Sequence, residues 1–430
     1  MLIYNLRQVN IINNIASNAY GSCLISFGST KVICTASFEK GSPPFLQGSG
    51  KGWLTAEYAM LPGSTSSRKK RDGVKRDSRS VEISRLIGRS LRQAIDLYAI
   101  GENTITIDCD VLQADGGTRT ASISGGFVAL CLCVSRMMEE GIISASPILR
   151  QVAAISCGIV DGKIVLDLDY FLDSNAYTDA NIVGDNLGNI IEVQATGERE
   201  PFSRKELTML LDAAEFGVRV VQSRQQLALK DKLAQLNIKP SIVIASSNAN
   251  KKRELKNILG KNYNIISPDE IGFNKEIVED GSTFSENAVI KAETLCRKTG
   301  YPSIGDDSGL MVHALNGAPG VYSARYAGDM HDDGKNNIKL LQDMQGIENR
   351  RAKFVCAAAL SFPQEETKVF TGEVFGEIGL APAGENGFGY DPLFVLPDGK
   401  TMAQINSSEK NAISHRAIAM KKLEASLKGE

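Results

Sequence analysis

The stretch Asp115-Gly116-Gly117-Thr118-Arg119-Thr120 decides how the first half of the chain is interpreted. It lies between a strand-like run at 104–112 and a helical stretch of small residues that begins near Ala121. Two glycines let the backbone turn tightly and approach a ligand, and the N–H groups at the start of the following helix point toward that ligand. Arg119 adds a planar guanidinium that can hold two phosphate oxygens. The stretch predicts a cradle for an anion, and the alternative is a Gly-Gly turn with a surface arginine.

The composition is that of an ordinary soluble globular protein. With 430 residues, 43% of them hydrophobic and 23% charged, the chain exceeds a usual single core, so we expect two domains or three. The longest uninterrupted apolar run, 127–134, is too short to span a bilayer. The first residues, MLIYNLRQVNIINN, lack the zones of a signal peptide. We therefore expect a cytoplasmic protein with no membrane partner.

Cysteine and histidine usage narrows the chemistry. The eight cysteines are scattered through apolar runs without a C-x-x-C pair, so we expect reduced core thiols rather than disulfides or zinc ligands. The three histidines, His313, His331 and His415, all lie in the second half. Chemistry in the first half must therefore rest on carboxylates, cations, hydroxyls or a bound metal.

Strand and helix patterns alternate along the first half. The strand signals are two hairpins, one about Gly28-Ser29-Thr30 and one about Asp161-Gly162. The helix signals are apolar positions at helical spacing over 81–98 and, after the GGTRT turn, an apolar stretch to about Glu140. Because strands alternate with helices, the predicted fold class is α/β or α+β.

A domain boundary is predicted near residue 239. A long amphipathic helical pattern runs from Ser203 to Leu236 and is interrupted near Gly217. Pro240 cannot continue a helix, and an apolar strand at 242–245 follows at once. We therefore expect one domain over 1–239 and a second over 240–430.

Two charged groups in the first half are candidates for phosphate and metal binding. The run RKKRDGVKRDSR at 68–79 has seven basic residues and two acidic ones, and it is either a solvated loop or a guide for an RNA backbone. Four aspartates follow the second hairpin, and their mutual repulsion is relieved by a hard divalent metal unless they are simply solvated loop acids. These are Asp167, Asp169, Asp173 and Asp179.

Residues 7 to about 236 resemble ribonuclease PH, the phosphate-dependent 3′-to-5′ exoribonuclease that trims transfer-RNA precursors. The resemblance implies a domain like the second domain of ribosomal protein S5. It covers nearly the whole first half through STKVICTAS (29–37), PPFLQGSGKGWLTAEYAMLP (43–62), SRSVEISRLIGRSLR (78–92), IDCDVLQADGGTRTASISGG (107–126) and LDLDYFLDSNAYTDAN (166–181).

The resemblance implies roles for nine residues of the first half. Asp173 and Asp179 would hold Mg²⁺ and support the displacement, in which inorganic phosphate, as co-substrate, attacks the terminal phosphodiester of an RNA 3′ end. Arginines and metal would offset the charge of the two phosphates. The phosphate ligands would be Arg79, Gly117, Thr118 and Arg119, and the contacts to the transfer-RNA backbone would be Arg68, Arg71 and Arg76.

The second half begins with another anion-binding pattern. The strand at 242–245 is followed directly by Ser246-Ser247-Asn248-Ala249-Asn250-Lys251 and then by a helical stretch through Leu259. A strand, a small polar turn and a helix with a lysine in its first turn suit phosphate. The glycines of a Walker loop are missing.

Three further groups in the second half can bind metal and nucleotide. The adjacent acids Asp306 and Asp307, expected at the end of a strand over 301–304, suit Mg²⁺ and water activation, and the alternative is a turn with exposed acids. The run Phe388-Gly389-Tyr390-Asp391 offers a ring for stacking and an acid to read a base edge. The run Ser414-His415-Arg416 offers more hydrogen-bond donors.

Residues 242 to 427 resemble the inosine/xanthosine triphosphate pyrophosphatases, which convert non-standard purine nucleoside triphosphates to monophosphate and pyrophosphate. The motifs are SSNANKKREL (246–255), EDGSTFSENAVIKA (279–292), GDDSGLMVHALNGAPGVYSARYAG (305–328), GFGYDPLF (387–394) and EKNAISHR (409–416). The resemblance implies that Glu279 and Asp307 bind Mg²⁺, that Asp307 is also the base toward water, and that Phe388 to Asp391 read the base. The implied nucleotide ligands are Ser246, Ser247, Asn248, Ala249, Asn250, Lys251, Ser308, Lys410, His415 and Arg416.

Together the two resemblances imply a fused bifunctional enzyme. They also imply a homo-oligomer, with a hexameric ring from the first domain and dimer contacts from the second. One alternative for the first half is a catalytically silent RNA-binding ring component, which the presence of Asp173, Asp179 and Arg119 disfavours. The alternative for the second half is a nucleotide house-cleaning hydrolase with a different base choice.

Overall fold

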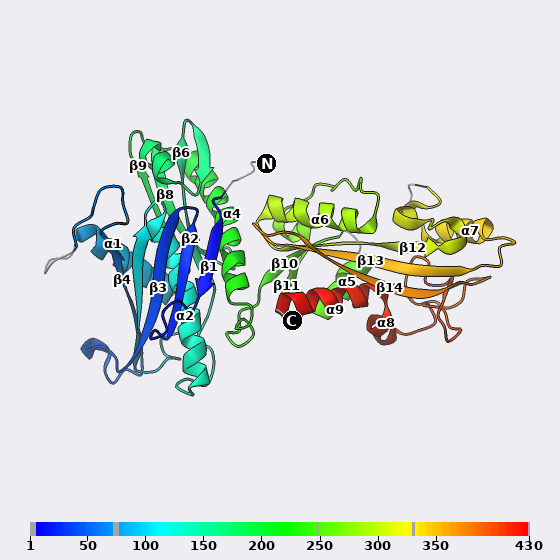
Figure 1. The fold of residues 1–430 in the computed structure, drawn as a ribbon, viewed down its shortest axis with the longest axis horizontal. Helices are drawn as coiled ribbons and strands as arrows, with labels where there is room; N and C mark the ends of the chain where they lie inside the picture. The colour runs from blue at the N-terminus through cyan, green and yellow to red at the C-terminus, as the bar shows by residue number, and fades with distance from the viewer. Residues whose placement is uncertain (1–5, 72–76, 247–248, 329–331, 429–430) are drawn as a thin grey trace. The chain divides into compact units, whose positions relative to one another are not determined.

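The computed structural model describes residues 6–71, 77–246, 249–328 and 332–428. The chain divides into two compact units, 1–240 and 241–430 (Figure 1). The division lies one residue beyond the boundary that Pro240 predicted. Each unit has its own sheets and its own hydrophobic core.

The first unit contains two sheets. In the five-stranded sheet β4 runs parallel to β5 and the other neighbours are antiparallel, while the four-stranded sheet is antiparallel throughout. Positive φ angles at Gly28, Asp161 and Gly162 confirm the two predicted hairpin turns. In spatial order the strands of the five-stranded sheet are β1 (Val9–Asn13), β2 (Gly21–Phe27), β3 (Thr30–Lys40), β5 (Asn103–Gln113) and β4 (Trp53–Met60). The strands of the four-stranded sheet are β7 (Lys163–Leu166), β6 (Val152–Val160), β8 (Thr178–Asp185) and β9 (Ile190–Gly197).

Helix α2 forms the centre of the first unit. It packs against β2 and β3 of one sheet and β6 of the other, while α1 covers β4 and α4 covers β6. Within the described residues α2 is the one helix long and apolar enough to cross a membrane, but 89% of its apolar window is buried inside this unit. The helical segments are η1 (Pro44–Leu46), α1 (Ser78–Arg92), α2 (Thr118–Glu139), α3 (Tyr170–Asn175) and α4 (Arg204–Ala228).

The predictions for two helices in this unit were partly wrong. Helix α1 ends at Arg92 rather than near Tyr98, because the backbone of Ala94 and Asp96 pairs with the 147–149 segment instead of continuing the helix. Helix α4 ends at Ala228 rather than at Leu236, and it is not interrupted at Gly217. A Cβ there would lie 3.0 Å from Ile155, so the glycine lets a continuous helix approach the sheet closely.

The second unit is a mixed sheet covered on both faces. Helix α6 packs on β12 and β13 from one side, and α9 packs on β13 and β14 from the other (Figure 1). Strand β10 is parallel to β11 and β12, and the remaining pairs are antiparallel. The order is β11 (Asn264–Ile266), β10 (Ser241–Ala245), β12 (Ser303–Val312), β13 (Arg351–Ser361), β14 (Lys368–Ile378), β15 (Phe394–Val395), with η2 (Pro268–Ile271), η3 (His313–Leu315), η4 (Gly320–Arg325), α5 (Ala249–Leu259), α6 (Phe284–Thr299), α7 (Asp333–Asp343), α8 (Ser407–Ile413) and α9 (His415–Lys428).

The paired aspartates lie inside β12 rather than at a strand end, which corrects the prediction. Asp306 and Asp307 face Ala358 and Ala357 on β13, and the strand continues to Val312. Because neighbouring side chains of a strand point to opposite faces of the sheet, the two carboxylates reach different partners. Strand interiors disfavour aspartate, and here cations on both faces offset that preference.

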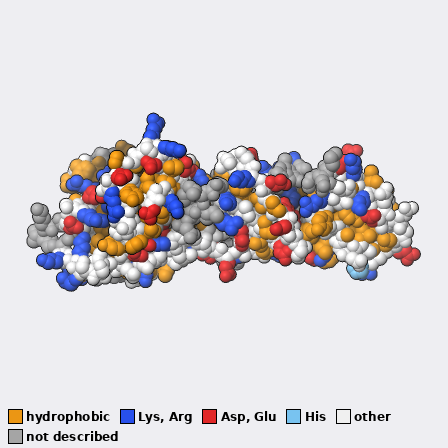
Figure 2. Space-filling view, turned by 90° about the horizontal axis from the view of Figure 1, so that it is seen from above, with side chains coloured by type: hydrophobic (Ala, Val, Ile, Leu, Met, Phe, Trp, Pro, Cys, Tyr) orange, Lys and Arg blue, Asp and Glu red, His pale blue; other side chains and the backbone are white. Residues whose placement is uncertain are grey.

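Side chains outside the sites agree with the composition. All eight cysteines are free and buried, so they lie in the core as predicted. Figure 2 shows basic, acidic and hydrophobic side chains interspersed over the drawn face.

Candidate functional site

The Gly-Gly turn that was predicted to form an anion cradle is present at the start of α2. Gly117 caps the helix with φ 64° and ψ 24°, and Gly116 has φ 71°. This left-handed region favours glycine. A Cβ on Gly116 would lie 2.3 Å from the carbonyl oxygen of Leu168, so the backbone also needs the missing side chain for space. The two glycines are required where the sequence placed them.

The hydroxyl of Thr118 has a partner that the sequence did not reveal. The phenol of Tyr58, from β4, lies 2.9 Å from Thr118 Oγ1. Burial raises the pKa of Tyr58, although Thr118, Arg79 and Arg119 act in the opposite direction. The phenol is therefore neutral at physiological pH and available to orient the threonine. The sequence feature that could have identified Tyr58 is the run TAEYAMLP, in which the polar residues Thr55 and Glu57 alternate with the buried residues Ala56 and Tyr58.

Two arginines stand over the start of α2. Arg119 donates to Gln194 Oε1 at 3.0 Å and lies 3.7 Å from the carboxylate of Glu82. Arg79 is exposed in the first turn of α1. Burial raises the pKa of Asp173 and both guanidiniums oppose that rise, which places their charge within reach of the acidic group described next.

Asp173 from α3 and Asp179 from β8 form an acidic pair. Burial raises the pKa of Asp173. Burial and, next in size, repulsion from Asp173 raise the pKa of Asp179 to about 6. Two carboxylates that oppose each other's ionisation fit a bound divalent cation, which would remove the repulsion.

The other two aspartates of the predicted cluster have different tasks, which corrects that prediction. The carboxylate of Asp167 pairs with Arg7 at 2.6 Å, and Asp169 caps α3 by accepting from the N–H of Leu172. Within the ranges that the structure describes, no group of three or more acidic, histidine or cysteine side chains could hold a metal. A cation here would take two carboxylates from the protein and its other ligands from phosphate and water.

The basic run contributes exposed charge beside this site. Arg68 and Arg71 are exposed, and Lys69 pairs with Asp77 at 3.2 Å. Arg76 lies outside the described residues. A solvated basic segment is what backbone contact with RNA requires.

In the second unit Asp306 is the centre of a buried ion-pair group. Its carboxylate lies 2.5 Å from Lys251 Nζ, in the first turn of α5, and accepts from Arg416 Nε at 3.1 Å. Although burial alone would raise it, the pKa of Asp306 is held well below its usual range by these two cations. Arg416 also donates to Ser308 Oγ at 3.0 Å. Three predicted nucleotide ligands, Lys251, Ser308 and Arg416, are thus brought together around Asp306. That role of Asp306 was not predicted.

Asp307, on the opposite face of β12, meets α6. Its carboxylate accepts from Asn287 Nδ2 at 3.2 Å and lies 3.4 Å from Lys291 Nζ, which also lies 2.7 Å from Glu279. Burial raises the pKa of Asp307 while Lys291 opposes that effect. The two predicted metal ligands therefore share one ammonium group, and two carboxylates plus nucleotide phosphates still fit a divalent cation.

Asn287 and Lys291 were not predicted as site residues. They are four residues apart on α6, so they share one helix face, and that face is buried against β12. Asn287 Oδ1 also accepts from the N–H of Gly281, two residues after Glu279. The signal that could have found them is a polar pair at helical spacing on the buried face of an amphipathic helix.

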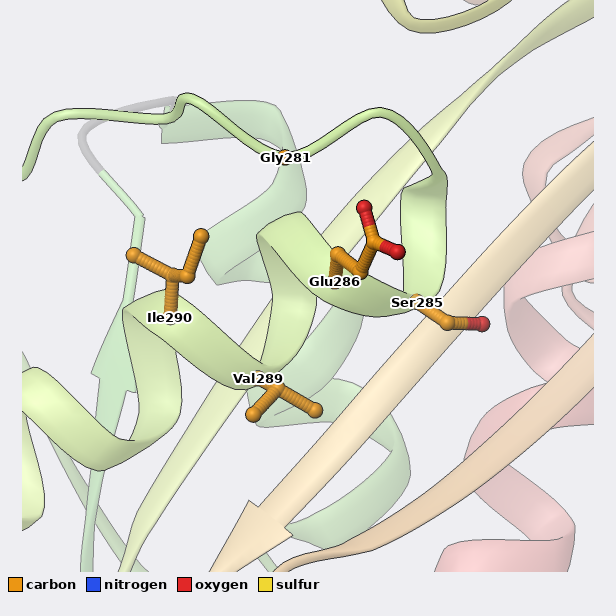
Figure 3. Close-up of a pocket in the computed structure, with 5 residues that line it drawn as sticks. All are labelled: Gly281, Ser285, Glu286, Val289 and Ile290. Carbon is orange, nitrogen blue, oxygen red and sulfur yellow. The ribbon is translucent and has the colours of Figure 1, made fainter.

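A shallow depression of about 400 Å³ lies beside the start of α6, lined by Gly281, Ser285, Glu286, Val289 and Ile290 (Figure 3). Glu286 points toward the loop that carries Gly281, and its carboxylate accepts from the backbone N–H and the hydroxyl of Ser282. That carboxylate stabilises the start of the helix. The depression adjoins the Glu279 loop but contains none of the charged groups described above.

The predicted base-reading segment is tightly organised. Lys410 Nζ lies 4.7 Å from the ring centre of Phe388 and 2.5 Å from Asp391, which also accepts from the N–H of Phe388. On the Gly389 peptide, the N–H donates to Asp333 at 2.8 Å and the carbonyl accepts from Asn337 at 2.9 Å. The loop thus presents an aromatic face beside a buried ammonium.

Two predicted ligands, Tyr390 and His415, are buried and make contacts that mainly stabilise the fold. Tyr390 is buried and donates its hydroxyl to the carbonyl of Ser323 at 2.8 Å. His415 is buried and stacks on Phe354, and its Nδ1 has no partner within the described residues. Burial lowers the pKa of His415 well below its usual value, so the ring is neutral.

The turn after β10 is only partly described. Ser246 donates its backbone N–H to Ile244 at 2.9 Å, and Ala249 and Asn250 lie in the first turn of α5. Ser247 and Asn248 lie outside the described residues. The strand and the helix on either side of the predicted phosphate-binding turn are therefore present.

Comparisons with known proteins agree with this division. The model of the 3′ exoribonuclease family matches residues 5–135 with its domain 1 and 150–216 with its domain 2, and the Ham1 family model matches 242–426. A ribonuclease PH of Corynebacterium glutamicum is 53% identical over 226 residues, which are 52% of this chain and 92% of that protein.

Solved structures resemble the second unit. The Staphylococcus aureus Ham1 protein has 48% sequence identity, and the match covers 44% of this chain and 98% of that chain with a TM-score of 0.42. A nucleoside-triphosphatase described as a dITP/XTP pyrophosphatase, from Mycobacterium abscessus, has 42% identity and covers 43% of this chain and 97% of that chain, with a TM-score of 0.38.

Proposed function

The chain belongs to the 3′ exoribonuclease family through its first unit and to the Ham1 family through its second, and on that basis we propose a bifunctional enzyme. The first activity is phosphate-dependent shortening of transfer-RNA and other RNA 3′ ends. The second is hydrolysis of ITP, dITP and XTP to monophosphate and pyrophosphate. We further propose a cytoplasmic homo-oligomer, with a ring formed by the first unit and dimer contacts through the second.

The observation that supports the first activity is an anion cradle whose two arginines lie within electrostatic reach of an acidic pair. Gly117, Thr118 and Arg119, with Arg79, would hold inorganic phosphate as the nucleophile. A phosphate oxygen then forms a bond to the terminal phosphorus as the bond to the neighbouring 3′ oxygen breaks. The released product is a nucleoside diphosphate, and the leaving 3′ oxygen takes up a proton, balanced by the proton that the attacking phosphate loses, to become the new 3′ hydroxyl of the shortened RNA.

Asp173 and Asp179 would hold Mg²⁺ in this site. When bound, the ion offsets the charge of the two phosphates that are brought together. The protein's own contribution is to hold phosphate in line with the RNA end and to donate hydrogen bonds from fixed groups.

The test of the first activity compares RNA products with and without phosphate. A transfer RNA with an extended 3′ end should be shortened only when phosphate is present, and the products should be nucleoside diphosphates. Arg119→Ala should lower kcat/KM about 100-fold or more, whereas Arg136→Ala, an arginine paired with Glu140 at the far end of α2, should not. Equal degradation in phosphate-free buffer, with release of monophosphates, contradicts the proposal. Absence of any shortening by the parent protein would favour the silent ring component.

The observation that supports the second activity is the set of contacts around Asp307. Its carboxylate contacts Lys291 and Asn287, and Glu279 pairs with the same ammonium group of Lys291. Asp307 would accept a proton from the attacking water, and it would share Mg²⁺ with Glu279. Lys251, Ser308 and Arg416 would bind the phosphate chain. The ion, when bound, neutralises the triphosphate and withdraws charge from the bond that breaks.

Base choice follows from hydrogen-bond chemistry at the other end of the site. Phe388 offers a stacking face, and Lys410, Arg416 and a neutral His415 are donors. A 6-keto group accepts from such donors, whereas the 6-amino group of adenine leaves them unpaired at about 1–3 kcal/mol each. ITP, dITP and XTP should therefore be split much faster than ATP, with pyrophosphate as the first product. Comparable kcat/KM for ATP and ITP, or release of orthophosphate, contradicts the assignment, and a comparison that includes dGTP separates it from a hydrolase with another base choice.

A further inference from the structure

Arg7 forms an extensive set of contacts next to the phosphate cradle without being one of its ligands. Its guanidinium meets Asp167 through Nε at 3.0 Å and Nη2 at 2.6 Å, and its backbone N–H donates to the same carboxylate at 2.9 Å. The Asp167 side chain is 1% exposed. The pair is therefore a buried, bidentate ion pair that fixes the plane of the guanidinium.

The same guanidinium also holds two backbone segments. Nη1 donates to the carbonyl of Asp115, and Nη2 donates to the carbonyl of Leu168 at 3.2 Å. Asp115 directly precedes the two cradle glycines, and Leu168 precedes the cap of α3, the helix that carries Asp173. One side chain thus ties the predicted phosphate site to the predicted metal site.

The neighbouring contacts show that residues outside the cradle hold its backbone in position. Thr30, at the start of β3, accepts from the N–H of Asp115 at 3.0 Å and donates to the carbonyl of Gly116 at 2.7 Å. The Asp115 carboxylate accepts from the N–H of Tyr170 at 3.2 Å. A Cβ on Gly117 would lie 3.4 Å from Arg7 Nη2, so the guanidinium lies against the cradle backbone itself.

We propose that Arg7 is a positioning residue for phosphorolysis, holding the cradle at a fixed separation from Asp173 and Asp179 while Asp167 holds Arg7. The proposal rests on the phosphorolytic function of the first unit. Phosphate attack requires the two phosphates in line at near-contact distance, and a displacement of about 1 Å at such a site costs on the order of 100-fold in rate. The competing explanation is that Arg7 only neutralises a buried carboxylate.

The two explanations differ in a double variant. Arg7→Met alone leaves the Asp167 carboxylate buried without its cation, and it can unfold the unit for that reason. Adding Asp167→Asn removes the stranded charge, and asparagine tolerates the φ of 58° at this position. The double variant therefore removes the tie to Asp115 without leaving a buried unpaired charge, because the Asp115 carboxylate, 3.8 Å from Arg7, is 34% exposed to solvent. Arg7→Lys keeps the charge but lacks the planar fork, and Arg136→Met is the control for losing a paired arginine of the same unit.

The experiment measures phosphate KM, RNA KM and kcat for RNA shortening, thermal unfolding, and amide hydrogen exchange over 115–117. For Arg7→Met/Asp167→Asn we expect near-parental unfolding, faster exchange at the cradle, phosphate KM raised about tenfold, kcat lowered on the order of 100-fold and unchanged RNA KM. Arg7→Lys should lie between the double variant and the parent, and Arg136→Met should match the parent.

Parental phosphate KM and kcat in a folded double variant would overturn the proposal and leave Arg7 as a charge partner of Asp167. An equal rise in the KM for RNA and for phosphate would also overturn it, because the effect would then not be specific to the cradle. RNA shortening by the parent protein without phosphate would overturn the phosphorolytic function and this inference with it, and it is recognised in the parent before any variant is compared.

Discussion

The two sites differ in how the charge of their paired aspartates is offset. Within the described part of the chain Asp173 and Asp179 form no salt bridge, and the pKa of Asp179 is raised to about 6. In the second unit each aspartate of the pair has its own protein cation, Lys251 and Arg416 for Asp306 and Lys291 for Asp307. The first site is therefore under electrostatic strain until a cation or substrate arrives, and the second is organised by its own side chains.

This difference has a functional consequence. A site whose carboxylates form no salt bridge depends on metal and on the arginines of the cradle to bring two phosphates together. A site with fixed ammonium groups can orient a triphosphate before the metal binds. The predictions below follow from that contrast, and each changes the charge or the geometry of one site only.

The largest expected effect is loss of one activity at a time. Asp179→Asn should lower phosphorolysis about 1000-fold or more and leave ITP hydrolysis unchanged, and Asp307→Asn should do the reverse, because each removes a ligand and a charge from one core only. Both activities are measured on each purified full chain, with thermal unfolding as the control for folding. Loss of both activities from either substitution would show that the two units are not chemically independent.

Removing the internal cation of the second site should produce the next effect. Lys291 opposes the rise in the pKa of Asp307, so Lys291→Met should raise that pKa further. Less of the base is then ionised at neutral pH, and the acid limb of kcat/KM for ITP moves to higher pH, with activity at pH 7 lowered tens of fold as an order of magnitude. Arg297→Met, an exposed cation of the same helix, is the matched control. An unmoved acid limb would mean that Lys291 does not act through Asp307.

The electrostatic strain in the first site should be measurable as a pH-dependent change in the free energy of unfolding. The pKa of Asp179 is about 6 in the folded state and about 3.9 in an unfolded chain. The folded protein therefore binds the proton more tightly, and this group's contribution favours folding below about pH 4 and is lost as pH rises to about 6. Asp179→Asn should be more stable than the parent at pH 7 by at most about 3 kcal/mol, with little difference near pH 4. Mg²⁺ should narrow the gap at pH 7, and a gap that is independent of pH contradicts this cause.

The sequence predicted local structure well where one backbone property decides it. The Gly116-Gly117 turn, the hairpins and the division of the chain after Pro240 each depend on φ preference or on a missing donor, which a short window of sequence contains. Helix ends were less predictable, because α1 stops where a distant segment captures its backbone.

Partner choice within the sites was the part that could not be predicted. Asp167 was expected beside Asp173 because they are close in sequence, but it pairs with Arg7, 160 residues away. Tyr58 and Lys291 meet Thr118 and Asp307 only because strands and helices pack face to face. Residue type, spacing and family resemblance predicted candidate ligands, whereas the side chains that orient these candidates depend on tertiary packing.

The smallest expected effect concerns the loop that presents Phe388. Asp333 and Asn337, both on α7, hold the two sides of the Gly389 peptide, whose φ of 63° keeps the turn tight. Loss of one such hydrogen bond costs about 1 kcal/mol, or roughly fivefold. Asn337→Leu should therefore lower the ratio of kcat/KM for ITP over ATP about fivefold with little change in kcat for ITP, because the loop is loosened while the phosphate end is untouched.

Gln342→Leu is the control for that substitution, since it removes an exposed amide from the same helix. It should leave the ratio unchanged. If Asn337→Leu instead slows ITP and ATP equally, the α7 contacts act on the phosphate end and not on the base. The loop at Phe388 would then owe its geometry to the Asp391 and Lys410 pair alone, and base selection in the second unit would be organised by charge in the same way as its paired aspartates.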